Sequence, residues 1–591
     1  MKNLTELYTE RVANFEKEVT ALNQKLQLFS TLRLLVFLLT AVTVYFASVD
    51  AKYVIGTLLI GIPLFLFLVS KHANIKAEKA KFQELVNLNN VELQVLNRNY
   101  SKLPTGSEFN LETHFFSQDI DLFGSGSFYQ VSNRTKLAEG SKKLAAIYLE
   151  NSIDGIEDKQ QAIKEIANLI DWRQEFAAMA ALTKTETLTK TITDWLKNYT
   201  PFVPKVMQYI PLIFSVLSIV VFIAYFFDYI PESLLILWWA LGMIIVGLLT
   251  KKVMKLGQDA SKLKSTFDQY NQLLAMIENT EFTSGLLKKK KAEISSGSEK
   301  NSKVLKKFAT LLGNLDRNNN LLYILIANGF FLRSLVDCLA IEKWISSHGK
   351  EVETWFEAIA FFDAYSSLGN YAFNHETFTY PTITNTDTVL QAQQAGHPLL
   401  NPSKSILNDI TINGGQFFII TGANMAGKST FLRTVSLQIM MANVGLPVCA
   451  KTVSYSPIKL ITSMRTTDSL TDDESYFFSE LKRLRYIVDE IETDRYFIVL
   501  DEILKGTNST DKALGSRKFV ERLVKSKSTG IIATHDLSLC EVAKEHAAVK
   551  NYYFDAEIID NELHFDYTFK NGICQNMNAS FLLKKMGIID N

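Results

Sequence analysis

The stretch Phe417–Ser429 reads FFIITGANMAGKS and decides the fold of the C-terminal part of the chain. Its first half is a continuous apolar run, which is typical of a central strand in a parallel sheet. Its second half matches the pattern GxxxxGK[ST], and a helix is expected to follow from Thr430 to Met441. A strand, a glycine-rich loop and a helix in this order predict a phosphate-binding loop, because loop N–H groups and the helix N-terminus favour a bound anion.

This loop is expected to bind ATP and Mg²⁺. Lys428 would reach the β- and γ-phosphates as one of the catalytic residues, and the Ser429 hydroxyl would be a ligand of Mg²⁺. The predicted nucleotide-binding residues are Gly422, Ala423, Asn424, Met425, Ala426, Gly427, Lys428, Ser429 and Thr430. A glycine-rich turn that binds no nucleotide is the alternative interpretation.

Two further apolar runs end in residues suited to phosphate chemistry. Phe497–Leu500 is followed by Asp501 and Glu502. We expect Asp501 to hold Mg²⁺ and Glu502 to orient and polarise the attacking water, as a catalytic residue. The run Gly530–Ala533 leads to His535, which is predicted to contact the γ-phosphate and to be catalytic as well.

Several of these segments carry a family resemblance. Thr421–Arg433, TGANMAGKSTFLR, resembles the phosphate-binding loop of the MutS family of DNA mismatch-repair ATPases. Asp501–Asp511 resembles the Walker B segment of that family, and Ala533–Leu537 resembles its histidine motif. Ser475–Glu480 is similar to its serine-bearing loop, and Asp121–Leu144 to its helical core domain. The resemblance implies an α/β P-loop ATPase domain of the ABC type at the C-terminus, preceded by a mostly α-helical core domain.

The resemblance also implies a homodimer in which each ATPase domain completes the other's site. Ser475 would then contact the partner's nucleotide, and Gly506–Asp511 would lie at the interface. No segment before residue 115 resembles the family's mismatch-reading domain, so the chain is expected to lack it. Ser405 and Ile406 stand where the family often offers an aromatic side chain to adenine.

Four uncharged apolar runs, arranged in two pairs, precede the ATPase domain. They are 34–49 and 53–70, then 210–227 and 234–250. Their length is close to that of a membrane span, and basic residues flank the open ends of both pairs. The positive-inside rule then predicts two transmembrane hairpins in a bacterial-type inner or plasma membrane, with both termini and the ATPase domain cytoplasmic. Four buried core helices are the alternative, and a fifth run, Leu321–Leu332, is predicted to be a buried helix.

Composition and these runs set the domain limits. The 591 residues include 62 Lys and Arg and 62 Asp and Glu, which excludes a chain that grips nucleic acid by overall charge. The four cysteines are far apart and indicate neither a disulfide framework nor a zinc site. We expect N-terminal helices with the first hairpin over 1–100, a helical core interrupted by the second hairpin over 101–395, and the ATPase domain over 396–591.

Three functions fit the sequence. The first is a membrane-anchored MutS-like ATPase that uses ATP to switch its dimer and engages DNA, in mismatch repair or related DNA processing. The second is a nucleotide-dependent scaffold or switch of a membrane complex that binds no DNA. The third is an ABC-type transporter, which predicts an LSGGQ-like signature before the Walker B strand. Asp472–Arg495 contains no such signature.

Overall fold

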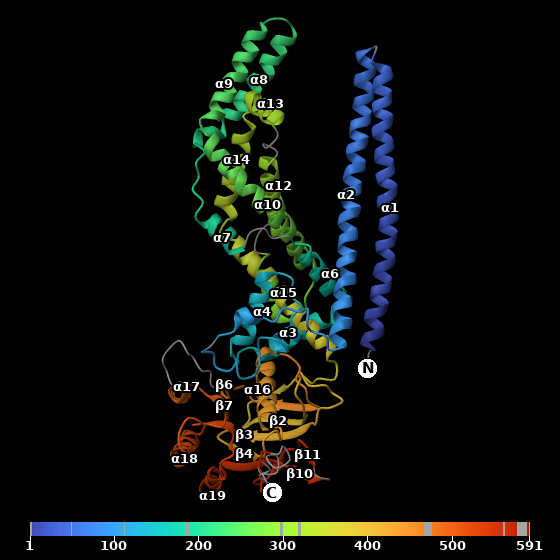
Figure 1. Ribbon diagram of the computed structural model, residues 1–591. Coiled ribbons are helices and arrows are strands. Elements are labelled where there is room, and N and C mark those ends of the chain that lie inside the picture. The colour runs from blue at the N-terminus through green and yellow to red at the C-terminus, as the bar shows by residue number, and fades with distance from the viewer. Residues whose placement is uncertain are drawn as a thin grey trace.

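A computed structural model describes residues 3–48, 50–111, 113–183, 189–295, 299–316, 321–465, 476–559, 562–575 and 588–589. The N-terminal two thirds form an elongated assembly of helices, and the C-terminal third forms an α/β unit at one end of it (Figure 1). Two helical hairpins reach away from the sheets, and both of their turns lie at the opposite end of the molecule (Figure 1).

The first hairpin consists of α1 (Leu4–Ala47) and α2 (Ala51–Leu96), which run antiparallel. The side chain of Asp50 caps α2 by accepting a hydrogen bond from the backbone N–H of Lys52. Of the most apolar 18-residue window of each helix, none is buried in α1 and 11% is buried in α2. The protein's own core therefore does not cover these two apolar runs.

Among the described residues, α1 and α2 are long and apolar enough to cross a membrane by length and composition. The number of candidate spans among the described residues rises to four if each of two bent pairs of helices is counted as one span. These pairs are α9 (Glu232–Gly247) with α10 (Thr250–Asn279), bent by 68°, and Ile324–Phe331 of α13 with α14 (Arg333–His348), bent by 81°. The second predicted hairpin corresponds to α8 (Ile210–Phe226), a shorter apolar helix, and α9.

The core of the helical part is built around α15 (Val352–Asn374), whose residues are almost all buried as far as Ala372. Gly369 lets α15 approach α5 closely, since a Cβ there would lie 2.6 Å from Cγ2 of Ile166. The other helices here are α3 (Phe128–Ser132), α4 (Ala138–Leu149), α5 (Ile156–Asn168), α6 (Ile170–Ala181), α7 (Thr189–Lys197), α11 (Gly285–Glu293), α12 (Asn301–Asp316) and α13 (Leu321–Phe331).

The first hairpin is joined to this core by a buried polar network. Oε1 of Glu92 on α2 accepts from Nε of Arg134 at 2.7 Å and from Nδ2 of Asn370 at 3.0 Å, and its Oε2 accepts from Nδ2 of Asn374 at 2.8 Å. The hydroxyl of Tyr8 on α1 donates to Oδ1 of Asn374 at 2.6 Å. Both helices of the hairpin are therefore fixed to the end of α15.

The α/β unit has a six-stranded sheet of order β12-β9-β4-β8-β7-β6, parallel except for β12. Its strands are β4 (Phe417–Gly422), β6 (Lys459–Ser463), β7 (Tyr496–Asp501), β8 (Thr529–Ala533), β9 (Val549–Phe554) and β12 (Lys570–Asn571). A second sheet has the order β1-β5-β2-β3. It contains β1 (Thr382–Ile383), β2 (Thr388–Ala395), β3 (Asn408–Asn413) and β5 (Thr452–Tyr455), and β10 (Ala556–Ile559) pairs with β11 (Glu562–Phe565).

Helices connect the parallel strands, as expected of crossover connections. They are α16 (Lys428–Val444), α17 (Tyr476–Ile491), α18 (Ser509–Lys525) and α19 (Val542–Glu545). The residues predicted as strands over 417–420, 496–500 and 530–533 lie in β4, β7 and β8, whose side chains are buried on both faces. The sequence prediction of these three central strands is therefore confirmed.

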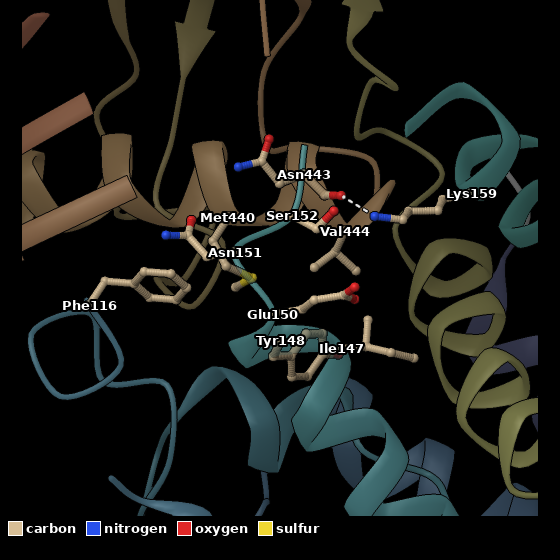
Figure 2. A pocket seen from close by; sticks show the side chains of 10 residues that line it. All are labelled: Phe116, Ile147, Tyr148, Glu150, Asn151, Ser152, Lys159, Met440, Asn443 and Val444. Atoms are coloured by element: carbon tan, nitrogen blue, oxygen red, sulfur yellow. Dashed lines mark hydrogen bonds between the residues drawn. The ribbon is translucent and has the colours of Figure 1, made fainter. Parts of the chain in front are cut away.

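The end of α16 packs against the helical core. Asn151 exchanges two hydrogen bonds with the backbone of Leu460, and Nζ of Lys159 donates to the carbonyl of Asn443 at 3.4 Å. Figure 2 shows the small cavity at this joint, about 10 Å³ in volume, close to the space that one water molecule needs. Gly445, with φ +89°, ends α16 where a Cβ would lie 2.7 Å from Cβ of Lys159. The joint therefore holds the two parts in direct contact.

Candidate nucleotide-binding site

The predicted site residues meet at one edge of the six-stranded sheet. β4, β8 and β7 are adjacent and parallel, with Ile420 opposite Ala533 and Asp501 opposite Ala533 on the other side. The carboxyl ends of parallel strands share one edge, so the segments after these strands are brought together. Nζ of Lys428 lies 3.3 Å from Nε2 of His535, and Oε1 of Glu502 lies 2.9 Å from the same nitrogen.

The loop between β4 and α16 turns tightly, with positive φ angles at three of its residues. Gly422 has φ +151° and Gly427 has φ +101°, and a Cβ on Gly422 would lie 2.6 Å from the carbonyl oxygen of Phe554. Met425 also has a positive φ of +67°. Glycine at 422 is therefore required by the close approach of β9.

Lys428, the first residue of α16, points back into this loop. Its Nζ donates to the carbonyls of Gly422 at 2.8 Å and Ala423 at 3.0 Å. Burial lowers the pKa of Lys428 from its ordinary value, and the nearby carboxylates of Asp501 and Glu502 oppose that effect. The ammonium is thus held at the centre of the loop, where a phosphate group bound by the loop would sit.

Ser429 and Asp501 form a pair of hard oxygen donors. The Ser429 hydroxyl donates to Oδ2 of Asp501 at 2.6 Å, and burial raises the pKa of Asp501. The described residues contain no cluster of three or more His, Cys, Asp and Glu side chains that could hold a metal. Two oxygen ligands suit Mg²⁺, which usually keeps several waters and binds through one or two protein oxygens together with substrate phosphates.

Glu502 is held in an uncommon conformation next to His535. Its φ is +50°, and its backbone N–H donates to the carbonyl of Ala533 at 2.9 Å. The hydrogen bond to His535 is the main reason why the pKa of Glu502 is lowered to about 2. Non-glycine residues with positive φ cost energy and persist where the surroundings enforce them, often at functional sites. A carboxylate with so low a pKa is a weak base. It is therefore better suited to orienting a water molecule by a hydrogen bond than to accepting a proton from it.

Glu480 on α17 is a functional candidate to which the sequence analysis gave no role. Its side chain is 3% exposed, and its carboxylate accepts the backbone N–H groups of Leu504 at 2.5 Å and Lys505 at 3.0 Å. It therefore fixes the turn directly after Glu502. The partners are backbone groups, so the sequence offers only a weak signal, an acidic residue among the apolar positions of an amphipathic helix. Ser475, predicted to contact a partner's nucleotide, lies outside the described residues.

A cavity of about 420 Å³ opens beside Gly427 and the start of α16. Residues that line it include His397, Leu400, Ile406, Thr430, Phe431 and Tyr567. The ring of Tyr567 stands close to the loop, since a Cβ on Gly427 would lie 3.0 Å from its Cδ1. Burial lowers the pKa of His397 to about 4, so this imidazole is neutral at physiological pH. Ser405 and Ile406, which also line the cavity, have no aromatic ring, whereas Tyr567 places one there.

The site is also tied to the helical core through α16. Nε of Arg433 donates to the carbonyl of Asp119 at 3.1 Å, and its NH1 lies 3.4 Å from the carboxylate of Asp121. Asp119 in turn accepts the backbone N–H of Arg465 at 2.8 Å. A shift of α16 would therefore change the contacts that Arg433 makes with Asp119 and Asp121 in the helical part.

Residues 418–585 match the family model of MutS domain V. The match contains the loop after β4, the carboxylates Asp501 and Glu502 at the end of β7, and His535. Residues 418–585 are therefore similar to MutS domain V, and through this segment the chain is similar to MutS proteins. The resemblance seen in the sequence motifs is thereby confirmed.

Individual MutS relatives agree with this family. The chain is 32% identical over 213 residues to "MutS protein homolog 4" of Homo sapiens, a match that covers 34% of this chain and 22% of that protein. It is 30% identical over 219 residues to "DNA mismatch repair protein MSH4" of Arabidopsis thaliana, covering 36% and 27%. It is 31% identical over 237 residues to "DNA mismatch repair protein MutS" of Chloroflexus aurantiacus, covering 39% and 24%. The chain thus spans about a quarter of the length of the MutS proteins it matches.

Proposed function

We propose that this chain is a membrane-anchored, MutS-like ATPase in which ATP binding and hydrolysis switch the conformation of a dimer. The observation that carries the proposal is the convergence of Lys428, the Ser429–Asp501 pair and the Glu502–His535 pair at one sheet edge. A cation, a pair of oxygen ligands and a carboxylate beside a glycine-rich loop are the parts that phosphoryl transfer to water requires.

Each residue has a separate role in this proposal. Lys428 exchanges its bonds to the carbonyls of Gly422 and Ala423 for the β- and γ-phosphates of ATP. Ser429 and Asp501 would hold Mg²⁺, and the ion would supply positive charge to the phosphates when bound. Glu502 orients the attacking water once a phosphate draws His535 away from it. Glu480 keeps the turn after Glu502 in place, and is therefore a positioning residue.

The cavity beside Gly427 is the proposed site of the nucleoside. It lies next to the phosphate loop and combines an aromatic ring, Tyr567, with apolar side chains such as Leu400 and Ile406. Such a cavity fits a planar base, because aromatic rings stack on base faces. In this proposal the ring on which adenine stacks is Tyr567, from the segment between β11 and β12.

The membrane anchor consists of the two hairpins, α1–α2 and α8–α9. Many of their apolar side chains are exposed, and such a surface suits lipid. Basic residues flank the open ends of both hairpins in the sequence, including Arg33, Lys71, Lys205, Lys251 and Lys252. The positive-inside rule then puts both termini and the ATPase domain in the cytoplasm, at an inner or plasma membrane of bacterial type.

Two copies are proposed to join through their ATPase domains. Several matched relatives are named DNA mismatch repair proteins, which supports DNA as a partner and a role in mismatch repair or related DNA processing. A nucleotide-dependent scaffold of a membrane complex, without DNA, is the second candidate, because the zero net charge and the membrane helices favour it. An ABC-type transporter is the least favoured of the three.

The deciding experiment measures steady-state ATP hydrolysis by the full chain in liposomes, with and without duplex DNA at low salt. Glu502→Gln is the blank, and Lys428→Ala should lose nucleotide binding, whereas Lys518→Ala, an exposed lysine on α18, should not. Stimulation of hydrolysis by DNA supports the DNA-processing function. Hydrolysis that is unchanged by DNA supports the scaffold and removes DNA from the proposal.

A further inference from the structure

We propose that α13 is a membrane-embedded half-helix, which enters the bilayer beside the α8–α9 hairpin and leaves it again as α14. Lipid acyl chains cover its outward face. This would be a third membrane element of the chain, in addition to the two hairpins, and it rests on the membrane anchor proposed above.

The position of α13 on the second hairpin is the first argument. Figure 1 shows α13 beside α8 and α9, below the turn that joins them. A Cβ on Gly242 of α9 would lie 2.2 Å from the carbonyl oxygen of Gly329, so the two backbones touch. The rings of Phe222 on α8 and Phe330 are 4.6 Å apart. Gly242 and Phe222 lie inside their helices, so α13 is level with the apolar part of the hairpin.

Hydrogen bonds from α8 and α9 to the backbone of α13 are the second argument. The Ser218 hydroxyl donates to the carbonyl of Phe330 at 2.6 Å, and accepts from Nε1 of Trp238 at 2.8 Å. Nε1 of Trp239 donates to the carbonyl of Leu325 at 2.8 Å. In hydrocarbon every backbone polar group must be satisfied within the protein, and a short helix leaves several carbonyls at its end unpaired. The buried Ser218 hydroxyl meets this need at Phe330, in the last turn of α13, whereas the bond to Leu325, in the middle of the helix, pairs the indole N–H of Trp239.

The break between α13 and α14 is satisfied in the same way. The two helices meet at 81°, at Leu332, whose φ is +49°. The buried side chain of Asn328 accepts the backbone N–H of Ser334 at 2.8 Å, in the first turn of α14. The charge of Arg333 is paired with Asp337 at 3.0 Å. The freed N–H of Ser334 therefore does not need water at this point, and the partly exposed Arg333 has a carboxylate partner.

The exposure of Ile326 is the third argument, and it is where the described part of α13 departs from the buried helix predicted over Leu321–Leu332. Ala327 and Asn328 are buried against the hairpin, whereas Ile326 is 60% exposed. The segment Ile324–Phe331 carries no charge. On the neighbouring helices, Leu212 of α8 and Leu237 of α9 are exposed as well. Lipid acyl chains suit these exposed apolar side chains, because one lipid phase can cover α8, α9 and α13.

The test uses a fluorescent NBD group attached to single cysteines of the full chain in liposomes. The background is Cys449→Ser, because Cys338, Cys540 and Cys574 are buried. Ile326→Cys reports on α13, and Leu217→Cys on the exposed face of α8 is the matched membrane position. Ser346→Cys, exposed on α14, is the matched position outside the bilayer. Quenching by lipids brominated in their acyl chains is compared with quenching by aqueous iodide.

The inference predicts loss of NBD emission with brominated lipids at positions 326 and 217, and with iodide only at 346. Quenching of position 326 by iodide but not by brominated lipids would overturn it, while lipid quenching at 217 would leave the hairpin anchor intact. Absence of lipid quenching at both 217 and 326 would contradict the membrane anchor itself, and the inference with it.

Discussion

Oε1 of Glu502 lies 2.9 Å from Nε2 of His535, and that nitrogen lies 3.3 Å from Nζ of Lys428. Glu502 follows β7, His535 follows β8 and Lys428 is the first residue of α16. His535 therefore occupies the position between the proposed phosphate-binding cation and the proposed water-orienting carboxylate. It can exchange Glu502 for a phosphate oxygen when a nucleotide binds.

His535→Ala is expected to lower the rate of ATP hydrolysis by roughly 100-fold or more, with ATP affinity nearly unchanged, because a positioned polar partner of the reacting groups is lost. The pKa of Glu502 should rise from about 2 towards its ordinary value, since the hydrogen bond from His535 is the main cause of its lowering. Single-turnover hydrolysis measures the change in rate, and equilibrium binding measures the change in ATP affinity. Equal losses of both would show that His535 only supports the fold.

Ser429→Ala is expected to raise the Mg²⁺ concentration for half-maximal hydrolysis about tenfold or more, because one of two oxygen ligands is removed. Asp501→Asn should act in the same direction, since its Oδ2 is the partner of the Ser429 hydroxyl. A Mg²⁺ titration of the hydrolysis rate at saturating ATP makes the measurement. An unchanged Mg²⁺ requirement in both variants would remove this pair from the metal site.

Glu92→Ala is expected to destabilise the attachment of the N-terminal hairpin by about 3–5 kcal/mol, because it leaves the buried guanidinium of Arg134 without its carboxylate. Asn370 and Asn374 also lose their acceptor. Glu78→Ala, at an exposed position of the same helix, is the control and should change stability by less than about 0.5 kcal/mol. Denaturant titration in detergent provides both values, and similar midpoints for the two variants would refute the role of this network.

Asp363 makes stability depend on pH in an unusual direction. Burial raises its pKa from 3.8 to about 7, while it accepts the backbone N–H groups of Lys136 and Leu137. Because the folded state binds this proton more tightly than the unfolded state, the contribution of Asp363 to stability is present below pH 4 and is lost as the pH rises to about 7. Asp363→Asn should remove this loss. The difference in Tm between the two proteins, measured from pH 4 to 8, should therefore vary with pH, and a constant difference would contradict the assignment.

The local parts of the fold could be predicted from the sequence, because each has a continuous signal. The apolar runs of β4, β7 and β8 and the glycine pattern between 422 and 429 are local patterns, and the family match confirms the resemblance they carry. Tyr567 could not be predicted to line the site, because it follows Gly427 by 140 residues and no pattern links the two. Glu480 was missed because its partners are backbone N–H groups, which have no residue signature. The exposure of Ile326 within the predicted buried helix Leu321–Leu332 could not be predicted, because it depends on how α13 packs against α8 and α9.

The central claim is that hydrolysis of ATP takes place at the sheet edge where Lys428, Glu502 and His535 meet. Steady-state phosphate release by the full chain in liposomes, compared between the wild type and Glu502→Gln, tests it most directly. The account predicts Mg²⁺-dependent release by the wild type and a variant that still binds ATP but releases almost no phosphate. Equal phosphate release by both proteins would contradict it.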